Sequence, residues 1–387
     1  MVPRLTTIQN NYSFFLFGPR GSGKSTLLKA VLEEKKPVWI DLLDPDEEAI
    51  FQTDPNELTR RTSHLLSGSW VVIDEVQKAP KLLDLAHKLI EEKKIYFALS
   101  GSSARKLKRG GANLLAGRAF VRHLYPFTSL ELKEMFDLQK AMEWGMLPKI
   151  CEFDEEENKK RFLQAYANTY LKEEIQAEQI ARNLPGFRKF LEVAAQMNGQ
   201  PVNCSKIGRD IHVDHSVVKN YFEILKDTLI GFELTAYDTS IRKQQRKAPK
   251  FYFIDCGIKR ALDKSLDIPL RERTYEYGQM FEHLLILELF KLCQYRERDE
   301  SLHYLQTKDN VEVDLVIKRP GKPSLFIDIK STKQVSDTDF RSILEITDGL
   351  KEAKALLISN DPNKKSAQHV EALHWQTFLE LFQENKV

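Results

Sequence analysis

The sequence predicts an α/β protein that begins with a parallel sheet covered by helices. Two observations over roughly the first 130 residues support this fold class. Short apolar runs typical of β-strands alternate with helical segments, and a glycine-rich turn joins the first of these runs to a helix. After about Pro126 the sequence becomes charged and helical. At about 100–200 residues per domain, a chain of 387 residues should hold two to four domains.

Four apolar runs are predicted to be the strands of the first sheet. They are Phe14–Phe17, Val38–Ile40, Trp70–Ile73 and Ile95–Leu99. Short runs of this kind are typical of strands that are buried on both faces. Because helical segments separate them, the strands are expected to lie parallel, with the helices covering the sheet.

The composition excludes several classes of protein. Apolar residues make up 42% and charged residues 29% of the chain, which excludes wholesale disorder. The net charge is only +2, so a case for nucleic-acid binding must rest on a local patch. No apolar run approaches the roughly 18 residues of a membrane span and no signal peptide is evident, so we expect a cytoplasmic protein without a membrane partner. Scattered cysteines predict reduced thiols rather than a zinc site or disulfides: Cys151, Cys204, Cys256 and Cys293.

The strongest motif is GPRGSGKS at Gly18–Ser25, which fits the pattern G-x-x-x-x-G-K-[ST]. Glycines let such a loop fold around phosphates, with its N–H groups pointing inward at a helix N-terminus. We therefore predict ATP binding, in which Lys24 neutralises the β- and γ-phosphates and Ser25 helps to hold Mg2+. The residues predicted to hold the nucleotide are Gly18, Pro19, Arg20, Gly21, Ser22, Gly23, Lys24, Ser25 and Thr26.

Two adjacent carboxylates end the apolar run of WVVIDEVQ, which starts at Trp70. Asp74 stands where an acid that organises magnesium belongs, and Glu75 stands where the residue that activates the attacking water belongs. On its own, an apolar strand that ends in Asp-Glu is common. Downstream of a phosphate-binding lysine, it predicts a magnesium-dependent ATPase rather than a protein that only binds ATP.

The next two segments supply further candidates for catalysis. The run IYFALSGSSARKL ends in small hydroxyl residues, of which Ser100 is the candidate to sense the γ-phosphate if its strand lies beside that of Asp74. The segment LAGRAFVRH supplies Arg118 and Arg122, one of which would reach a neighbouring subunit as an arginine finger. Taken alone, the serines mark the start of a loop and surface arginines are ordinary.

Taken in order, GPRGSGKST, WVVIDEVQ, ALSGSS and LAGRAFVRHLYPFTSLEL resemble a widespread prokaryotic family of AAA-type ATPases. The similarity extends to YLKEEI, KAPKFYFIDCGI, EVDLVI and LFIDIK, so it covers nearly the whole chain. The C-terminal half of that family is usually described as a domain of unknown function. The resemblance implies an AAA-type core at 1–130 with a helical lid at 131–186, a winged-helix-like DNA-binding domain at 187–262 and a restriction-endonuclease-like α/β domain at 263–387.

The middle of the chain independently predicts a DNA-binding helix-turn-helix. Asp214 should cap a second helix on which Ser216, Lys219 and Asn220 would face a DNA groove. A hairpin should follow, and its tip, IRKQQRKAPK, holds five basic residues and no acid, which suits a wing that grips phosphates: Arg242, Lys243, Arg246, Lys247 and Lys250. The alternative is a helical packing module with a soluble hairpin that docks a protein.

The end of the chain predicts a second cluster of carboxylates. Asp314 and Asp328 lie equally far from Gly321, so a hairpin centred there would make them cross-strand neighbours. With Glu282 on a preceding helix and Lys330 after Asp328, the pattern resembles a PD-(D/E)xK nuclease site. The three acids would bind one or two Mg2+ or Mn2+ ions, and Lys330 would stabilise the charge that develops on a phosphate. The alternative is a solvated hairpin edge.

The sequence therefore predicts an ATP-hydrolysing enzyme that remodels or translocates on DNA and carries a nuclease-like domain. ATP and Mg2+ are the expected cofactors, with a second Mg2+ or Mn2+ site near the C-terminus. DNA is the expected partner, and a homo-oligomer such as a hexameric ring is the expected assembly. The alternative function is a nucleotide-dependent switch that binds a protein partner, in which the nuclease-like domain is inactive.

Overall fold

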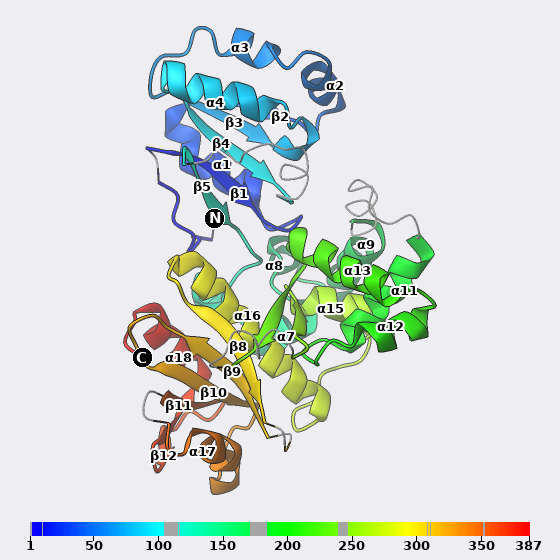
Figure 1. Ribbon diagram of the computed structural model, residues 1–387, viewed down its shortest axis with the longest axis vertical. Helices are drawn as coiled ribbons and strands as arrows, with labels where there is room; N and C mark the ends of the chain where they lie inside the picture. The colour runs from blue at the N-terminus through cyan, green and yellow to red at the C-terminus, as the bar shows by residue number, and fades with distance from the viewer. Residues whose placement is uncertain are drawn as a thin grey trace.

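The computed structural model describes residues 2–9, 11–103, 115, 117–170, 184–238, 247–307, 309, 311–350 and 353–387. These residues form two bodies that Figure 1 shows one above the other, each built around its own sheet. The N-terminal body holds the first five strands, and the larger body holds the remaining strands together with most of the helices.

The N-terminal sheet has five parallel strands in the order β2-β3-β4-β1-β5. They are β1 (Ser13–Phe17), β2 (Val38–Asp41), β3 (Trp70–Asp74), β4 (Tyr96–Gly101) and β5 (Ala119–His123). The first four coincide with the predicted runs, which confirms the α/β fold with a parallel sheet. Because all five strands point the same way, the loops after β1, β3 and β4 meet at one edge of the sheet.

Helices cover both faces of this sheet, as the alternation predicts. On one face, the side chains of β1 and β3 pack with those of α1 (Lys24–Leu32). On the other face, the cluster includes residues of α2 (Pro45–Thr53), α3 (Glu57–Arg61) and α4 (Leu82–Lys93). Short 3-10 turns complete this body: η1 (Glu33–Lys35) and η2 (Val76–Lys78).

The strand β5 was not predicted. Among the described residues, it lies at the edge of the sheet and pairs with β1 alone. Two of its apolar residues, Phe120 and Val121, are exposed, and the strand also carries Arg122. A half-exposed edge strand with a charge in it lacks the continuous apolar run that marks a buried strand, so its sequence gives no clear β signal.

The segment after β5 is helical, and it packs into the larger body. It contains α6 (Ser129–Leu132), the 3-10 turn η3 (Lys133–Met135), α7 (Leu138–Trp144), α8 (Pro148–Glu152), α9 (Glu156–Ala165) and the π-helical turn η4 (Tyr166–Tyr170). Helices α7 and α9 contact α15 (Cys256–Leu262), far along the chain. The buried Asp255 fixes this contact because its carboxylate caps α15 and also accepts from Met146 N at 2.7 Å.

The middle of the chain forms three helices and a two-stranded antiparallel pair. The helices are α11 (Leu184–Gln196), α12 (Cys204–Ile211) and α13 (His215–Asp227), and the strands are β6 (Gly231–Ala236) and β7 (Lys250–Phe253). Asp214 caps α13 by accepting from Ser216 N at 2.8 Å, as predicted. Residues between the two strands, 239–246, lie outside the described part of the chain.

The second sheet joins this antiparallel pair to the C-terminal strands. Among the described residues it has eight strands in the order β12-β13-β11-β10-β9-β8-β6-β7. The added strands are β8 (Ser301–Gln306), β9 (Glu312–Lys318), β10 (Ser324–Lys330), β11 (Ala353–Ser359), β12 (Lys365–Ala367) and β13 (Val370–His374). Strands β8, β9 and β10 form an antiparallel meander, and β11 lies parallel to β10. The predicted hairpin at Glu312–Lys330 is therefore the β9–β10 pair, and it turns at Gly321 with a φ of 71°.

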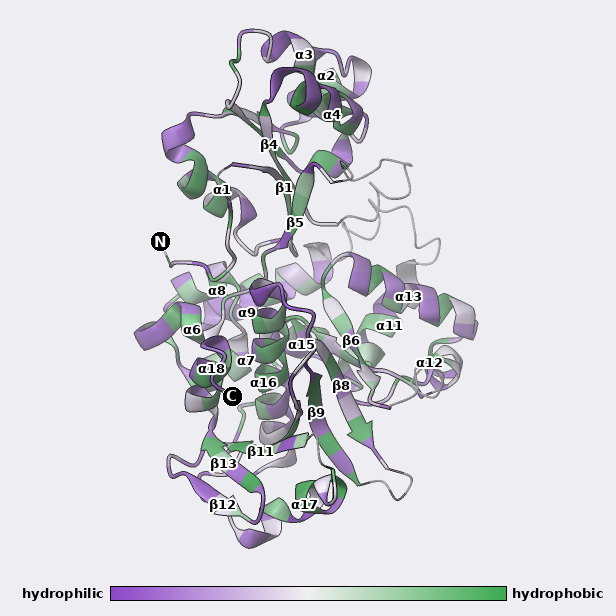
Figure 2. Cartoon of the chain, turned by 60° about the vertical axis from the view of Figure 1, so that its left-hand side comes forward, coloured by the Kyte–Doolittle hydropathy of each residue, from purple (hydrophilic) through white to green (hydrophobic). Residues whose placement is uncertain are grey.

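Helices cover both faces of the second sheet. The long α16 (Tyr275–Arg296) packs with α18 (Trp375–Gln383) in the large apolar cluster that includes Leu325 and Ile327 of β10. On the other face, α17 (Arg341–Thr347), preceded by the 3-10 turn η5 (Asp337–Phe340), packs against Phe326. Figure 2 shows hydrophobic residues concentrated along α16 and the strands beside it. No helix in the described part of the chain is long and apolar enough to cross a membrane.

Candidate functional site

The loop Gly18–Ser25 joins the end of β1 to the start of α1, at the edge where the parallel strands end. Glycine is required at several of its positions. A Cβ at Gly18 would collide with the carbonyl oxygen of Leu124. Gly21 and Gly23 have backbone φ angles of 78° and 94°, which residues other than glycine rarely adopt. The glycines at these three positions therefore fit the conformation of the predicted phosphate loop.

Lys24 is buried, and its ammonium group lies inside the loop. Its Nζ donates to the carbonyl oxygens of Gly18 at 2.9 Å and Pro19 at 3.4 Å. It also lies 3.9 Å from Oε1 of Glu75. The hydroxyl of Ser22 is buried in the same loop and has no hydrogen-bond partner among the residues that the structure describes. A buried cation and an unpaired donor in a glycine-rich loop at a helix N-terminus fit the phosphates of a nucleotide.

Asp74, the last residue of β3, is buried between two hydroxyl groups. Ser25 Oγ donates to its Oδ2 at 2.5 Å, and Ser100 Oγ donates to its Oδ1. This contact arises because β4 lies between β1 and β3, so the ends of all three strands converge. A carboxylate beside a hydroxyl supplies the hard oxygen ligands that Mg2+ prefers, so Ser25 and Asp74 fit the predicted ion.

Glu75 follows Asp74 with a φ of 58°, which turns its side chain into the loop region. Its Oε2 accepts a hydrogen bond from Nε2 of Gln77, which also donates to Ser102 Oγ at 3.2 Å. Sequence reasoning missed Gln77, although it stands two residues after the Asp-Glu pair. The close approach of Gln77 also explains Gly101, where a Cβ would collide with the amide oxygen.

The remaining predicted nucleotide residues lie at the outer side of the loop. Arg20 is exposed, and its carbonyl oxygen accepts from the hydroxyl of Tyr166 at 2.9 Å. Thr26 is exposed on the first turn of α1. Tyr166 lies in η4, so the nucleotide loop contacts the helical segment of the larger body directly. Sequence reasoning did not identify this residue, because the contact joins positions far apart in the chain.

The two candidate arginine fingers lie in different surroundings. Arg118 precedes β5 and forms an ion pair with Glu91 of α4, where both side chains are substantially exposed. Arg122 lies within β5, largely buried, and forms an ion pair with Glu297 just after α16. Arg122 therefore joins the two bodies of one chain, whereas Arg118 lies on the surface of the N-terminal body.

Only some of the residues predicted to contact DNA lie within the described part of the chain. Ser216 and Lys219 are exposed on α13, and Asn220 is half-buried beside them. Lys247 is exposed and donates to the carbonyl oxygen of Gln306 at 3.2 Å. Of the other predicted wing residues, three lie outside the described part of the chain: Arg242, Lys243 and Arg246.

The inclusion of Lys250 in the exposed basic tip was wrong. Lys250 is the first residue of β7, it is buried, and its Nζ forms an ion pair with Glu312 of β9. Burial by itself would lower the pKa of Lys250, but the carboxylates of Glu282, Glu312 and Asp314 together raise it above its usual value. Lys250 therefore neutralises a buried acidic cluster and is not available to phosphates.

Asp314 and Asp328 are cross-strand neighbours, as the hairpin spacing predicts. The register pairs Ile327 with Leu315, and one step further it places Asp328 opposite Asp314. Asp314 accepts from Ile329 N at 2.7 Å, and Asp328 accepts from Lys330 Nζ at 3.0 Å. Burial and the neighbouring Asp328 raise the pKa of Asp314 well above its usual range.

Glu282 lies on α16, outside the β9–β10 hairpin, and the charge of Asp314 affects its carboxylate. Its Oε1 accepts from the hydroxyl of Tyr252 at 3.0 Å. Burial, reinforced by the charge of Asp314, raises the pKa of Glu282 to about 8. Because side chains alternate along β10, Asp328 shares the α17 face with Phe326, whereas α16, which carries Glu282, covers the other face.

The structure does not support the predicted second metal site. Within the described ranges, no three His, Cys, Asp or Glu side chains are grouped so that they could hold a metal ion. Each acid instead has a partner within the chain: Glu282 accepts from Tyr252, Asp314 from Ile329 N and Asp328 from Lys330. Lys250 and Lys330 also supply positive charge to these acids from within the chain.

Comparisons with known families divide the chain into three parts. Residues 10–133 match the family model of an AAA domain. Residues 135–270 match a domain of unknown function, DUF8612, and residues 277–378 match a second one, DUF4143. The match to an AAA domain covers the N-terminal body, which holds the phosphate loop, the parallel sheet and the carboxylates that end β3.

The chain is also similar to individual proteins. It is 26% identical over 327 residues to an uncharacterised protein of Mycobacterium tuberculosis, Rv2008c, which corresponds to 83% of this chain and 70% of the relative. Among solved structures, a RuvB variant of Thermotoga maritima has a TM-score of 0.32 and 17% identity and covers 57% of this chain and 81% of its own. The Orc1 protein of Aeropyrum pernix in complex with DNA has a TM-score of 0.28 and 15% identity, and the match covers 65% of this chain and 86% of the Orc1 chain.

Proposed function

We propose that this chain hydrolyses ATP at the end of the N-terminal sheet and uses the turnover to move or remodel DNA. One observation carries the ATPase proposal. Hydroxyl groups of Ser25 and Ser100 donate to the two oxygens of Asp74, beside Lys24 and Glu75. A phosphate loop, a candidate magnesium ligand and a candidate base thus converge within one loop cluster.

Each residue of this cluster has a chemical role in the proposal. Lys24 and the backbone N–H groups of the loop bind the phosphates, and Glu75 orients and deprotonates the attacking water. Gln77 keeps the Glu75 carboxylate in place through its hydrogen bond. Ser25 and Asp74 would hold Mg2+, which when bound neutralises charge on the β- and γ-phosphates. Ser100 senses the γ-phosphate through its contact with Asp74.

The larger body is proposed to bind DNA in the manner of a winged helix. The exposed positions of Ser216 and Lys219 on α13 support this role, because α13 corresponds to the second helix of the predicted helix-turn-helix. The basic residues between β6 and β7 would contact phosphates. The pair β6–β7 continues into the C-terminal sheet, so DNA held there would be connected rigidly to the nuclease-like segment.

The nuclease-like segment is proposed to hold DNA without cutting it. The D-I-K motif lies on β10 beside Asp314, as the resemblance to PD-(D/E)xK nucleases implies, yet the acids are not grouped as metal ligands within the described residues. Lys250 and Lys330 neutralise them instead. A manganese-dependent cleavage assay on linear, forked and single-stranded DNA would show no product that is lost in the Asp314→Ala variant.

Oligomerisation completes the proposed site. A charge-stabilising arginine from a neighbouring subunit would balance the negative charge of the transition state. Arg118 is better placed for this role than Arg122, because Arg118 lies on the surface of the N-terminal body and Arg122 is paired with Glu297 inside the chain. A head-to-tail arrangement of this kind forms a ring such as a hexamer when the rotation between subunits closes.

The rate of ATP turnover with and without DNA tests the proposal. Purified protein is incubated with Mg2+ and ATP alone, then with duplex, forked or single-stranded DNA, and phosphate release is measured. The proposal predicts that at least one DNA structure raises the rate. If every DNA leaves the rate unchanged, the chain is better explained as a nucleotide-dependent switch that acts on a protein partner.

A further inference from the structure

The phosphate loop accepts hydrogen bonds from two side chains that belong to neither of its flanking elements, β1 and α1. The hydroxyl of Tyr166 donates to the carbonyl oxygen of Arg20 at 2.9 Å. Nη1 of Arg4 donates to the carbonyl oxygen of Ser22 at 3.0 Å. Two alternate carbonyl groups of the loop are thus held from outside it.

Each of these carbonyl groups shares a peptide plane with the N–H group of a glycine. The plane of the Arg20 carbonyl carries the N–H of Gly21, and the plane of the Ser22 carbonyl carries the N–H of Gly23. In a trans peptide the C=O and N–H bonds point in opposite directions. A side chain that holds the carbonyl oxygen therefore directs the glycine N–H to the opposite side of the loop. Gly21 and Gly23 both have positive φ angles, as in the concave loops whose N–H groups bind anions.

Tyr166 is fixed by the larger body. It begins the π-helical turn η4 directly after α9, and it is only 1% exposed. Its ring packs against that of Phe162, with 6.3 Å between the ring centroids, and it shares an apolar cluster with Leu147. Turns of π-helix within α-helices are frequently found at functional sites. The hydroxyl of Tyr166 therefore meets the loop from a well-packed position.

Arg4 is fixed by three groups in the segment that leads into the larger body. Its Nε pairs with Glu131 of α6 at 3.0 Å, its Nη2 donates to the carbonyl oxygen of Tyr125 at 2.5 Å, and its guanidinium carbon lies 4.6 Å from the ring centroid of Phe127. Glu131 is itself fixed, because its other oxygen accepts from Thr128 N in the capping box of α6. Since Glu131 neutralises the guanidinium, Arg4 acts on the loop through its planar fork of donors rather than through its charge.

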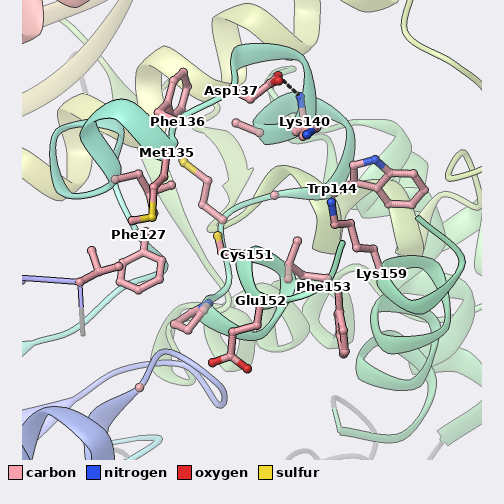
Figure 3. Close-up of a pocket in the computed structure, with 18 of the residues that line it drawn as sticks. Phe127, Met135, Phe136, Asp137, Lys140, Trp144, Cys151, Glu152, Phe153 and Lys159 are labelled. Carbon is pink, nitrogen blue, oxygen red and sulfur yellow. Dashed lines mark hydrogen bonds between the residues drawn. The ribbon is translucent and has the colours of Figure 1, made fainter. Parts of the chain in front are cut away.

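The loop is packed directly against the larger body. A Cβ added to Gly21 would lie 3.9 Å from Leu147, and one added to Gly23 would lie 3.7 Å from Pro148 of α8. Arg4 also lines the cavity shown in Figure 3. Gly23 and Thr26 line the same cavity, so it belongs to the proposed nucleotide site.

We propose that Tyr166 and Arg4 are positioning residues for phosphate binding, which hold the loop carbonyls so that the N–H groups of Gly21 and Gly23 point at the phosphates. Their role rests on the proposed nucleotide site and makes that site depend on the larger body. The loop is ready for phosphates only while α6 and η4 are packed against it. By linkage, phosphates bound in the loop favour the same packing of the two bodies.

Calorimetric titration of the full chain with ATP and with inorganic tripolyphosphate tests this role. Both titrations omit Mg2+ to prevent turnover, and tripolyphosphate carries only the phosphate part of the ligand. Tyr166→Phe removes the hydroxyl and keeps the buried ring. The free loop then samples other peptide orientations that binding must restrict, so both affinities should fall by the same factor of about three to ten. Tyr304→Phe is the matched control, because its hydroxyl donates to a backbone carbonyl outside the loop, that of Ala248.

Steady-state kinetics with Mg-ATP separates positioning from general damage to the fold. The glycine N–H groups bind the phosphates in the ground state and in the transition state alike. Tyr166→Phe should therefore raise KM about three- to tenfold and leave kcat within about twofold of the wild type.

Arg4→Lys is a second variant, which supplies the test if Tyr166→Phe does not fold. It keeps a positive charge beside Glu131, loses the fork that reaches Ser22, and should show the same pattern. Arg260→Lys is its control, since Arg260 is also buried and donates to backbone carbonyls outside the loop.

Equal tripolyphosphate affinities in the wild type and the folded variants would overturn the proposal. A loss of affinity confined to ATP would also overturn it, because the two side chains would then act on the nucleoside. A fall in kcat at constant KM would contradict a role in phosphate binding. If the wild type binds neither ligand, the proposed nucleotide site itself fails, and this role fails with it.

Discussion

Asp74 accepts hydrogen bonds from residues that lie on two other elements, Ser25 and Ser100. The sequence predicted all three residues: Ser25 from the glycine-rich motif, and Asp74 and Ser100 from the ends of apolar runs. It could not predict that both oxygens of Asp74 would be occupied, since that depends on β4 lying between β1 and β3. Gln77 was missed for a similar reason: its contact with Glu75 depends on the left-handed turn at Glu75.

Glu75→Gln should retain ATP binding and lose hydrolysis. The amide still accepts the hydrogen bond from Gln77, but it cannot take a proton from water, and loss of a general base costs about 100-fold or more. Nucleotide binding by fluorescence and phosphate release check the two halves of this prediction. Glu47→Gln, which alters a half-buried residue that pairs with Arg61 away from the nucleotide loop, is the control. Wild-type turnover in Glu75→Gln would show that another group activates the water.

Glu282→Gln should change how stability depends on pH. Burial raises the pKa of Glu282 to about 8 in the folded chain, from 4.5 when it is exposed. The folded state therefore holds more protons between these values, so this carboxyl makes the chain less stable as pH rises from about 5 to 8. The variant resembles the protonated form. The wild type should lose stability as the pH rises, while the variant should not. The free energy of unfolding of the variant minus that of the wild type should therefore increase by roughly 1–4 kcal/mol between pH 5 and pH 8.

Urea unfolding at the two pH values measures this difference. Glu276→Gln lies on the same helix with its side chain exposed, and it should show no such trend. A difference between Glu282→Gln and wild type that stays constant across this pH range would mean that Glu282 titrates normally in the folded chain.

At the scale of elements, long apolar or amphipathic segments were predictable and edge elements were not. The four buried strands, the cap of α13 by Asp214 and the β9–β10 hairpin follow from local sequence. The edge strand β5 was missed because its residues are half exposed. Lys250 was assigned to an exposed hairpin tip, but β7 begins at that residue and buries it against Glu312. Its partner lies on a distant strand, which no local pattern reveals.

Removing the wing charges should weaken DNA binding and reduce its dependence on salt. The variant replaces Arg242, Lys243, Arg246 and Lys247 with Ala. Each lost phosphate contact should lower the slope of log affinity against log salt by about 0.9 for duplex DNA. Fluorescence anisotropy over a range of salt concentrations measures the slope. The control removes the same charge from exposed lysines elsewhere, at Lys35, Lys88, Lys133 and Lys364. Equal slopes in both variants would place the DNA site away from the wing.

At the scale of the whole molecule, the predicted segments at 131–186, 187–262 and 263–387 share one large apolar cluster. Their limits remain predictions, because the described residues do not divide into separate cores at those positions. The helices α7 and α9 pack against α15 through contacts that join distant parts of the chain. An amphipathic pattern indicates that a helix buries one face, but it does not identify the element that covers that face.

A shared active site should be detectable by mixing two inactive variants. Arg118→Ala would lack the proposed finger and Lys24→Ala would lack the phosphate lysine. In an equal mixture whose subunits exchange, up to about a quarter of the sites would combine an intact Lys24 with an intact neighbouring Arg118. Phosphate release should recover to that extent. Arg60→Ala, at an exposed pair with Asp54, should stay fully active by itself. No recovery in a mixture shown to exchange subunits would argue against the trans arrangement.

Phosphate release from Mg-ATP by wild type and Lys24→Ala, measured side by side, tests the central claim most directly. Lys24 is the buried cation of the loop, within 3.9 Å of Glu75, and no other described part of the site can replace its charge. The account predicts steady release by the wild type and none above background by the variant, with equal thermal melting temperatures. Equal rates in the two proteins would contradict the assignment of ATP hydrolysis to this site.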